Sequence, residues 1–351
     1  MGVLHAFIAA IEQLRSLASH IPGIAPLAQE AFLFRPFILL LVLGVAAGAV
    51  GTLVNLRRVE FNAEAMVHSV FPGIVAGFAF GGTDAIPLGA SLVALLVVAA
   101  LVLVEHTEAH HEGGTAVVLT AFFGLGIVIS LKKGDMSGQL EALMFGRLLE
   151  VTDARLLQSL IVCLLALLLV IATWKENILV AHDREGARAM GINLLAVDLA
   201  LNCAIAAIVI SASSAVGVLL VIAYLVVPGA AGRLISASVG RMCAISILVA
   251  VLGGWLGMRL MLVPTPHPVS PQAAVVLSIV ALLVLIIAGL KIYTVLRKIM
   301  APKVKASTNC KGWVHSEYTP RNYDEHSRAP HHRTGDPRGT IGNRRNTGAP
   351  R

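Results

Sequence analysis

The segment FILLLVLGVAAGAVGTLVNL, residues 37–56, has no charged side chain and matches the length of about 20 residues with which a helix crosses a bilayer. The whole chain shares this character, since 57% of its 351 residues are hydrophobic and 13% are charged. A soluble domain carries about 25% charged residues. Aromatic residues make up only 5%, too few for the aromatic girdles of an outer-membrane barrel. We therefore predict an all-α protein, a polytopic helical bundle of the inner membrane.

Similar apolar windows recur along the chain. They begin near Phe34, Glu64, Ala85, Gly114, Ala154, Leu195, Val216, Met242 and Pro271. We expect about eight or nine transmembrane helices, each about 20 residues long. The count depends on residues 211–217, where two windows nearly touch and a broken or re-entrant helix fits as well as two spans.

Three regions follow from these patterns. They are an amphipathic N-terminal segment over residues 1–30, a transmembrane region over residues 31–300, and a disordered, basic cytoplasmic tail over residues 301–351.

The formal charge of +7 belongs to the C-terminal part of the chain. From Lys298 onward there are eleven Lys and Arg against four Asp and Glu, which leaves sixteen of each sign in residues 1–297. A basic tail is attracted to an anionic lipid surface whatever else it does. We therefore exclude nucleic-acid binding.

Basic residues also predict the orientation. If Arg57 and Arg58 face the cytoplasm, twelve Lys and Arg lie on that side and six on the other. This bias favours a cytoplasmic C-terminus. Lys132 and Lys133 count against it.

Glu64 and His68 are the strongest candidates for a binding site, since ionisable groups inside a membrane are costly and usually functional. At i and i+4 they share one face of the second helix. A carboxylate and an imidazole together suit Zn²⁺, Mn²⁺ or Fe²⁺. The alternative is a carboxylate near a helix start beside an ordinary histidine.

Other polar residues and breaks receive simpler interpretations. Asp198 is expected in a first helical turn, where it complements the helix dipole. Residues 105–112, EHTEAHHE, are interpreted as a solvated loop, with metal capture as the alternative. The pairs Pro72–Gly73 and Pro228–Gly229 predict bends in the second and seventh helices near a pathway.

Enzyme motifs are absent. No Lys is followed by Ser or Thr, so the chain has no P-loop with which to hydrolyse ATP, and the HExxH, HxxEH and GxSxG motifs do not occur. A polytopic chain without such motifs is a channel, an ion-coupled carrier or the membrane subunit of a transporter driven by another subunit. We therefore expect a non-enzymatic transport protein with no permanently bound cofactor.

A short polar segment between two apolar windows favours the last possibility. Residues 180–193, VAHDREGARAMGIN, predict a short amphipathic helix that ends at a glycine, and such an element needs a partner. The candidate coupling residues are Asp183, Arg184, Glu185, Arg188 and Gly191.

Four ordered motifs resemble the permease subunits of ABC transporters for zinc, manganese and iron. They are residues 56–69, LRRVEFNAEAMVHS; residues 143–149, LMFGRLL; residues 183–191, DREGARAMG; and residues 215–221 with 227–233, AVGVLLV and VPGAAGR. The similarity covers about residues 34–297. Glu64 stands where the family has Asp, and Asn62 and Ala63 stand where it has Gly.

The resemblance implies a metal-type ABC permease fold and a homodimer in the cell membrane. It also implies a cytoplasmic ATPase subunit that uses ATP and docks on the coupling segment, and an extracytoplasmic metal-binding protein that supplies the ion. Glu64 and His68 would form the metal site or gate. The alternatives are a proton- or ion-coupled carrier that uses Glu64 and His68, and a membrane scaffold without transport.

Overall fold

A computed structural model describes residues 2–106, 111–132, 146–213, 216–263 and 270–300. All regular secondary structure in these ranges is helical, which confirms the all-α prediction. The α-helices are α1 (Gly2–Ala18), α2 (Ala25–Ala28), α3 (Ala31–Arg57), α4 (Glu60–Ser69), α5 (Phe71–Gly81), α6 (Ile86–His106), α7 (His111–Lys132), α9 (Asp153–Ala172), α10 (Trp174–His182), α11 (Arg184–Ala189), α12 (Leu194–Ser213), α13 (Val218–Ile235), α14 (Val239–Met261) and α15 (Pro271–Met300), with 3₁₀ turns at Gly82–Ala85 and Leu148–Glu150. The predicted tail, residues 107–110 of the 105–112 segment and residues 143–145 of the LMFGRLL motif lie outside the described residues.

The number of membrane helices agrees with the prediction of about eight or nine. Within the described ranges, eight helical segments are long and apolar enough to cross a membrane, and Leu219–Ile235 is a shorter apolar helix. At the uncertain junction, α12 ends at Ser213 and α13 begins at Val218, so the two windows form separate helices.

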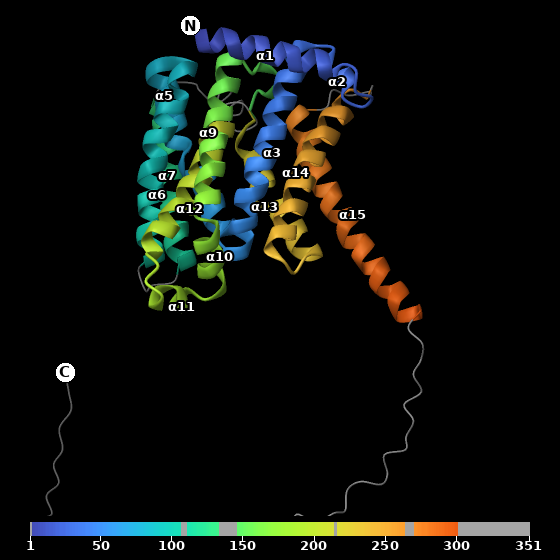
Figure 1. Ribbon diagram of the computed structural model, residues 1–351. Coiled ribbons are helices and arrows are strands. Elements are labelled where there is room, and N and C mark those ends of the chain that lie inside the picture. Colours follow the sequence, from blue (N-terminus) through green and yellow to red (C-terminus); the bar gives the residue numbers. More distant parts are fainter. Residues whose placement is uncertain (1, 107–110, 133–145, 214–215, 264–269, 301–351) are drawn as a thin grey trace, which may run out of the picture. The chain divides into compact units, whose positions relative to one another are not determined.

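Helix α3 lies at the centre of the bundle and packs against α9, α13 and α14 (Figure 1). Its small residues allow the close approach that membrane helices use where lipid offers no hydrophobic driving force. At Gly48, a Cβ atom would lie 2.8 Å from the Cα atom of Ile247 in α14.

The two ends of the bundle differ (Figure 1). Helix α1 lies across one end, here named the α1 end. The adjoining turn is fixed there by Trp255, whose Nε1 donates to the Gly23 carbonyl at 3.1 Å. Helix α11 lies at the opposite end, here named the α11 end.

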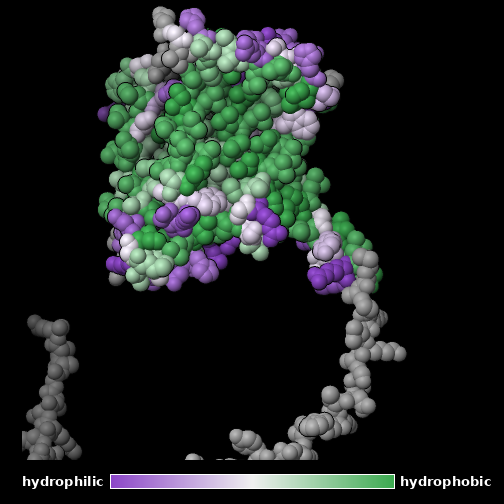
Figure 2. Space-filling view, viewed as in Figure 1, coloured by the Kyte–Doolittle hydropathy of each residue, from purple (hydrophilic) through white to green (hydrophobic). Residues whose placement is uncertain are grey.

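The side of the bundle is hydrophobic between polar ends, as Figure 2 shows for one face. On α6, Leu88, Leu95 and Leu103 are each more than 60% exposed. Exposed leucines over the whole length of a helix are costly in water and favourable in lipid. This surface is that of a multi-pass membrane protein.

Candidate functional site

Glu64 and His68 share one face of α4, as their spacing predicts. The Glu64 side chain is exposed on the surface of the chain, and His68 is partly buried. The His68 ring meets Phe123 of α7 edge-on, with centroids 5.9 Å apart and planes at 81°. An exposed carboxylate on a membrane helix is costly against lipid, so this face of α4 is suited to an aqueous path or to a second polypeptide.

One copy of the chain does not provide a complete metal site in its described part. No group of three or more His, Cys, Asp or Glu side chains lies there in a position to hold an ion. Glu64 and His68 offer one carboxylate and one imidazole, whereas zinc sites use three or four protein ligands. Within the described residues, this pair alone is therefore an incomplete set of metal ligands.

The two prolines at which bends are predicted lie in different structural settings. Helix α4 ends at Ser69, and α5 begins at Phe71 with Pro72 in its first turn, where the missing N–H costs no helical hydrogen bond. Helix α13 continues through Pro228. There Asn55 of α3 donates from Nδ2 to the Val226 carbonyl at 3.1 Å.

The glycines that follow these prolines are close-packing positions. A Cβ atom at Gly73 would collide with the Gly89 carbonyl of α6 and lie 2.8 Å from the Val93 Cβ atom. A Cβ atom at Gly229 would lie 2.5 Å from the Gly51 carbonyl oxygen of α3. Both helices therefore pack backbone to backbone beside their prolines.

Two of the motif segments meet in space. Gly146 and Gly217 both adopt positive φ values, and a Cβ atom at Gly146 would collide with the Gly217 backbone. Gln272 of α15 donates to the Gly146 carbonyl at 2.9 Å. Positive φ favours glycine, which accounts for glycine at both places.

The candidate coupling segment contains a short helix, as predicted. Asp183 is the N-cap of α11, and its Oδ1 accepts from the Gly186 N–H at 2.9 Å. Gly191, with φ of 83°, ends the element. The two arginines of α11 lie in different surroundings. Arg184 is partly buried and turns toward the bundle, whereas Arg188 is exposed. Glu185 is exposed as well.

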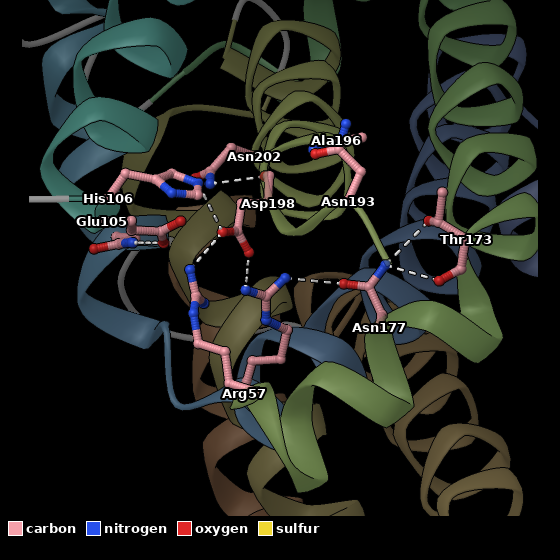
Figure 3. A network of polar contacts seen from close by, with 11 residues as sticks. Arg57, Glu105, His106, Thr173, Asn177, Asn193, Ala196, Asp198 and Asn202 are labelled. Carbon is pink, nitrogen blue, oxygen red and sulfur yellow. Dashed lines mark hydrogen bonds and ion pairs between the residues drawn. The ribbon is translucent and has the colours of Figure 1, made fainter. Parts of the chain in front are cut away.

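Asp198 does not lie in a first helical turn, so that interpretation is wrong. It is the fifth residue of α12, and its side chain is 0% exposed. Its Oδ1 accepts from Arg57, and its Oδ2 lies 2.7 Å from Nη2 of Arg184 and 3.3 Å from Nε2 of His106 (Figure 3). Fixed positive charges, rather than a helix dipole, hold this carboxylate in the protein.

The prediction of a solvated loop is also wrong for Glu105 and His106. Both belong to the last turn of α6. Glu105 Oε1 accepts from Asn62 Nδ2 at 2.5 Å, and His106 lies against Asp198. Residues 107–110 of this segment lie outside the described residues.

The sequence interpretation missed the polar network around Asp198. Arg57 donates from Nη1 to Asn177 Oδ1 at 3.1 Å, and Asn177 donates to the Thr173 carbonyl at 2.9 Å (Figure 3). Asn202 donates to the Asp198 carbonyl at 3.0 Å. The sequence contained one indication of this network, namely isolated polar residues near the ends of apolar helices.

Residues 29–289 match the family model described as the ABC 3 transport family. The chain is 30% identical over 254 residues to the zinc transport system membrane protein TroC of Treponema pallidum, covering 69% of this chain and 84% of that protein. It is also 30% identical over 226 residues to the manganese transport system membrane protein MntC of Bacillus subtilis, covering 62% of this chain and 51% of that protein. The solved structure of PsaBC from Streptococcus pneumoniae in complex with Fab aligns with a TM-score of 0.62 at 25% identity, over 75% of this chain and 94% of that one.

Proposed function

Because the chain belongs to the ABC 3 transport family, as the match over residues 29–289 establishes, we propose that it is the membrane permease subunit that moves a divalent transition metal across the cytoplasmic membrane. The observation that carries the proposal is this family match, together with relatives named for zinc and manganese transport. Membership of an ABC family favours transport driven by ATP over the ion-coupled alternative. The ATP is used by a partner subunit.

The metal site is proposed to form between two copies of the chain. Glu64 is exposed on one chain, and a twofold axis beside α4 would present two carboxylates and two imidazoles to one ion. This ligand set suits Zn²⁺, Mn²⁺ or Fe²⁺. The chain would thus act as a homodimer.

The partners are proposed to bind at opposite ends of the bundle. The ATPase subunit would dock on α11, where Glu185, Arg188 and Met190 are exposed. The extracytoplasmic metal-binding protein would deliver the ion at the α1 end. The pairs Pro72–Gly73 and Pro228–Gly229 are proposed to lie beside the metal path.

Metal uptake provides the direct test of the proposed function. Proteoliposomes with this chain and its ATPase subunit, supplied with the metal-binding protein and ATP, are expected to accumulate ⁶⁵Zn²⁺ or ⁵⁴Mn²⁺. Replacing ATP with a non-hydrolysable analogue should abolish uptake, because transport is proposed to depend on ATP hydrolysis by the partner subunit. Uptake driven by a proton gradient without ATP would support the carrier instead.

Cysteine labelling tests the proposed orientation. The native cysteines are first replaced, and single cysteines are then placed at Ala85, in the 3₁₀ turn between α5 and α6, and at Glu112, at the start of α7. In intact cells an impermeant maleimide is expected to label position 85. Position 112 should be labelled only after the cells are permeabilised. The basic residues near α11, including Arg57, Arg184 and Arg188, favour a cytoplasmic α11 end. Labelling of position 112 in intact cells would reverse the assignment.

A further inference from the structure

One buried carboxylate connects four helices at the α11 end. Asp198 of α12 contacts Arg184 of α11, His106 of α6 and Arg57 of α3 (Figure 3). The side chain of Arg57 is only 4% exposed, whereas that of Arg184 is 39% exposed. The network therefore runs from a partly exposed arginine on the coupling segment to a buried arginine at the end of the central helix.

Two routes lead from this carboxylate to α4. Arg57 is the last residue of α3, and α4 begins at Glu60, so the first route is the short turn between them. The second route passes from His106 to its neighbour Glu105. The Glu105 carboxylate accepts a hydrogen bond from Asn62 of α4. Both routes end in the N-terminal part of the helix that carries Glu64 and His68.

Asn62 also links α4 to a further helix. Its Oδ1 accepts from Thr115 Oγ1 of α7 at 2.9 Å, and α7 carries Phe123, the ring that contacts His68. A displacement of Asn62 would thus reach the surroundings of His68 through α4 and through α7. These contacts form a continuous chain of hydrogen bonds and packed side chains, the kind of network that can carry coupling between two sites.

The network lies beside free space into which its members can move. A cavity of about 280 Å³ is lined in part by Arg57, Arg58, Asn62, Glu105 and Arg184. In the described part of the chain, Glu105 Oε2 is buried without a hydrogen-bond partner. Glu105 thus lines the same cavity as Arg57 and Arg184 and offers an acceptor other than Asp198 to an arginine that shifts. Switching elements need such alternative packings.

Stability alone does not account for this ion network. Removing charges from water costs several kcal/mol per ion, and apolar side chains of similar volume often pack as well or better. A charged network with a spare acceptor is better suited to changing partners than to holding one conformation.

We propose that Asp198 is a positioning residue that transmits movement of α11 to α4, and thereby links the ATPase cycle to the metal site. This inference rests on the proposed function, in which α11 is the ATPase docking segment. Arg184 connects Asp198 to α11, and Arg57 connects Asp198 to the turn that leads into α4.

The ratio of metal transported to ATP hydrolysed tests the proposal in the complete transporter. The variants are Arg184→Gln, Asp198→Asn and the double variant, with ⁶⁵Zn²⁺ or ⁵⁴Mn²⁺ as the probe, whichever the wild type transports. Each single variant should lower the ratio about tenfold, within the usual range of coupling between sites. The double variant should fall no further than the single ones, because both changes break one link.

Arg184→Gln keeps the proposal testable if Asp198→Asn fails to fold, because Arg184 is partly exposed. The matched control is Arg35→Gln, which removes another ion pair between helices, with Asp153 at 2.7 Å. A purely structural role would lower transport and ATP hydrolysis together and leave the ratio unchanged. A wild-type ratio in Arg184→Gln would overturn the inference, whereas a wild-type complex that transports none of Zn²⁺, Mn²⁺ and Fe²⁺ would contradict the proposed function itself.

Discussion

Glu64→Gln and His68→Ala are each expected to lower metal uptake at least about tenfold, since either change removes one whole ligand type from a twofold site. Glutamine keeps the shape of glutamate but loses its charge. The loss should appear in uptake of ⁶⁵Zn²⁺ or ⁵⁴Mn²⁺ at equal amounts of membrane-inserted protein. Insertion is expected to be normal, because Glu64 is exposed and His68 is only partly buried.

Glu60→Gln is the matched control for this prediction. It changes the same residue type on the same helix, one turn before Glu64. This variant should keep near-normal uptake. If Glu64→Gln also transports normally, the pair is a feature of the helix start and the ion is bound elsewhere.

Arg188→Glu is expected to abolish ATP-driven uptake while leaving metal binding intact. Arg188 is exposed on α11, and Arg184, one turn earlier, is already paired with Asp198. Reversing a charge at a docked surface removes one contact and adds repulsion, a cost of about 2–5 kcal/mol when the contact is buried in the complex. Co-purification of the ATPase subunit with the permease measures the loss directly.

Arg241→Glu controls for a general effect of charge at the same end of the bundle. Arg241 is exposed in the first part of α14, and its Nε donates to Ser238 Oγ at 2.8 Å. The ATPase subunit should still co-purify with this variant. If it co-purifies equally well with Arg188→Glu and uptake persists, α11 is not its docking site.

Most of the fold could be predicted because it depends on local patterns. Each apolar window corresponds to a helical segment, since a backbone in lipid must satisfy its hydrogen bonds within the segment. The end of α11 at Gly191 was equally predictable, because positive φ favours glycine. These features depend on neighbouring residues alone.

The role of Asp198 could not be predicted in this way. Its partner Arg57 lies 141 positions away along the chain, and the two meet only when α3 and α12 pack side by side. The sequence offered a local interpretation, a carboxylate in a first turn, and the true helix start at Leu194 makes that interpretation wrong.

The sequence by itself determined the membrane class, the approximate helix count, the family and the pairing of Glu64 with His68 on one face. Periodicity and apolar length set the membrane class, the helix count and the shared face, whereas the resemblance of four ordered motifs indicated the family. Only the tertiary structure decided which polar side chains are buried together and that Glu64 remains exposed on a single chain. The physical reason is that burial and charge pairing depend on which helices become neighbours, and helix periodicity alone does not specify those neighbours.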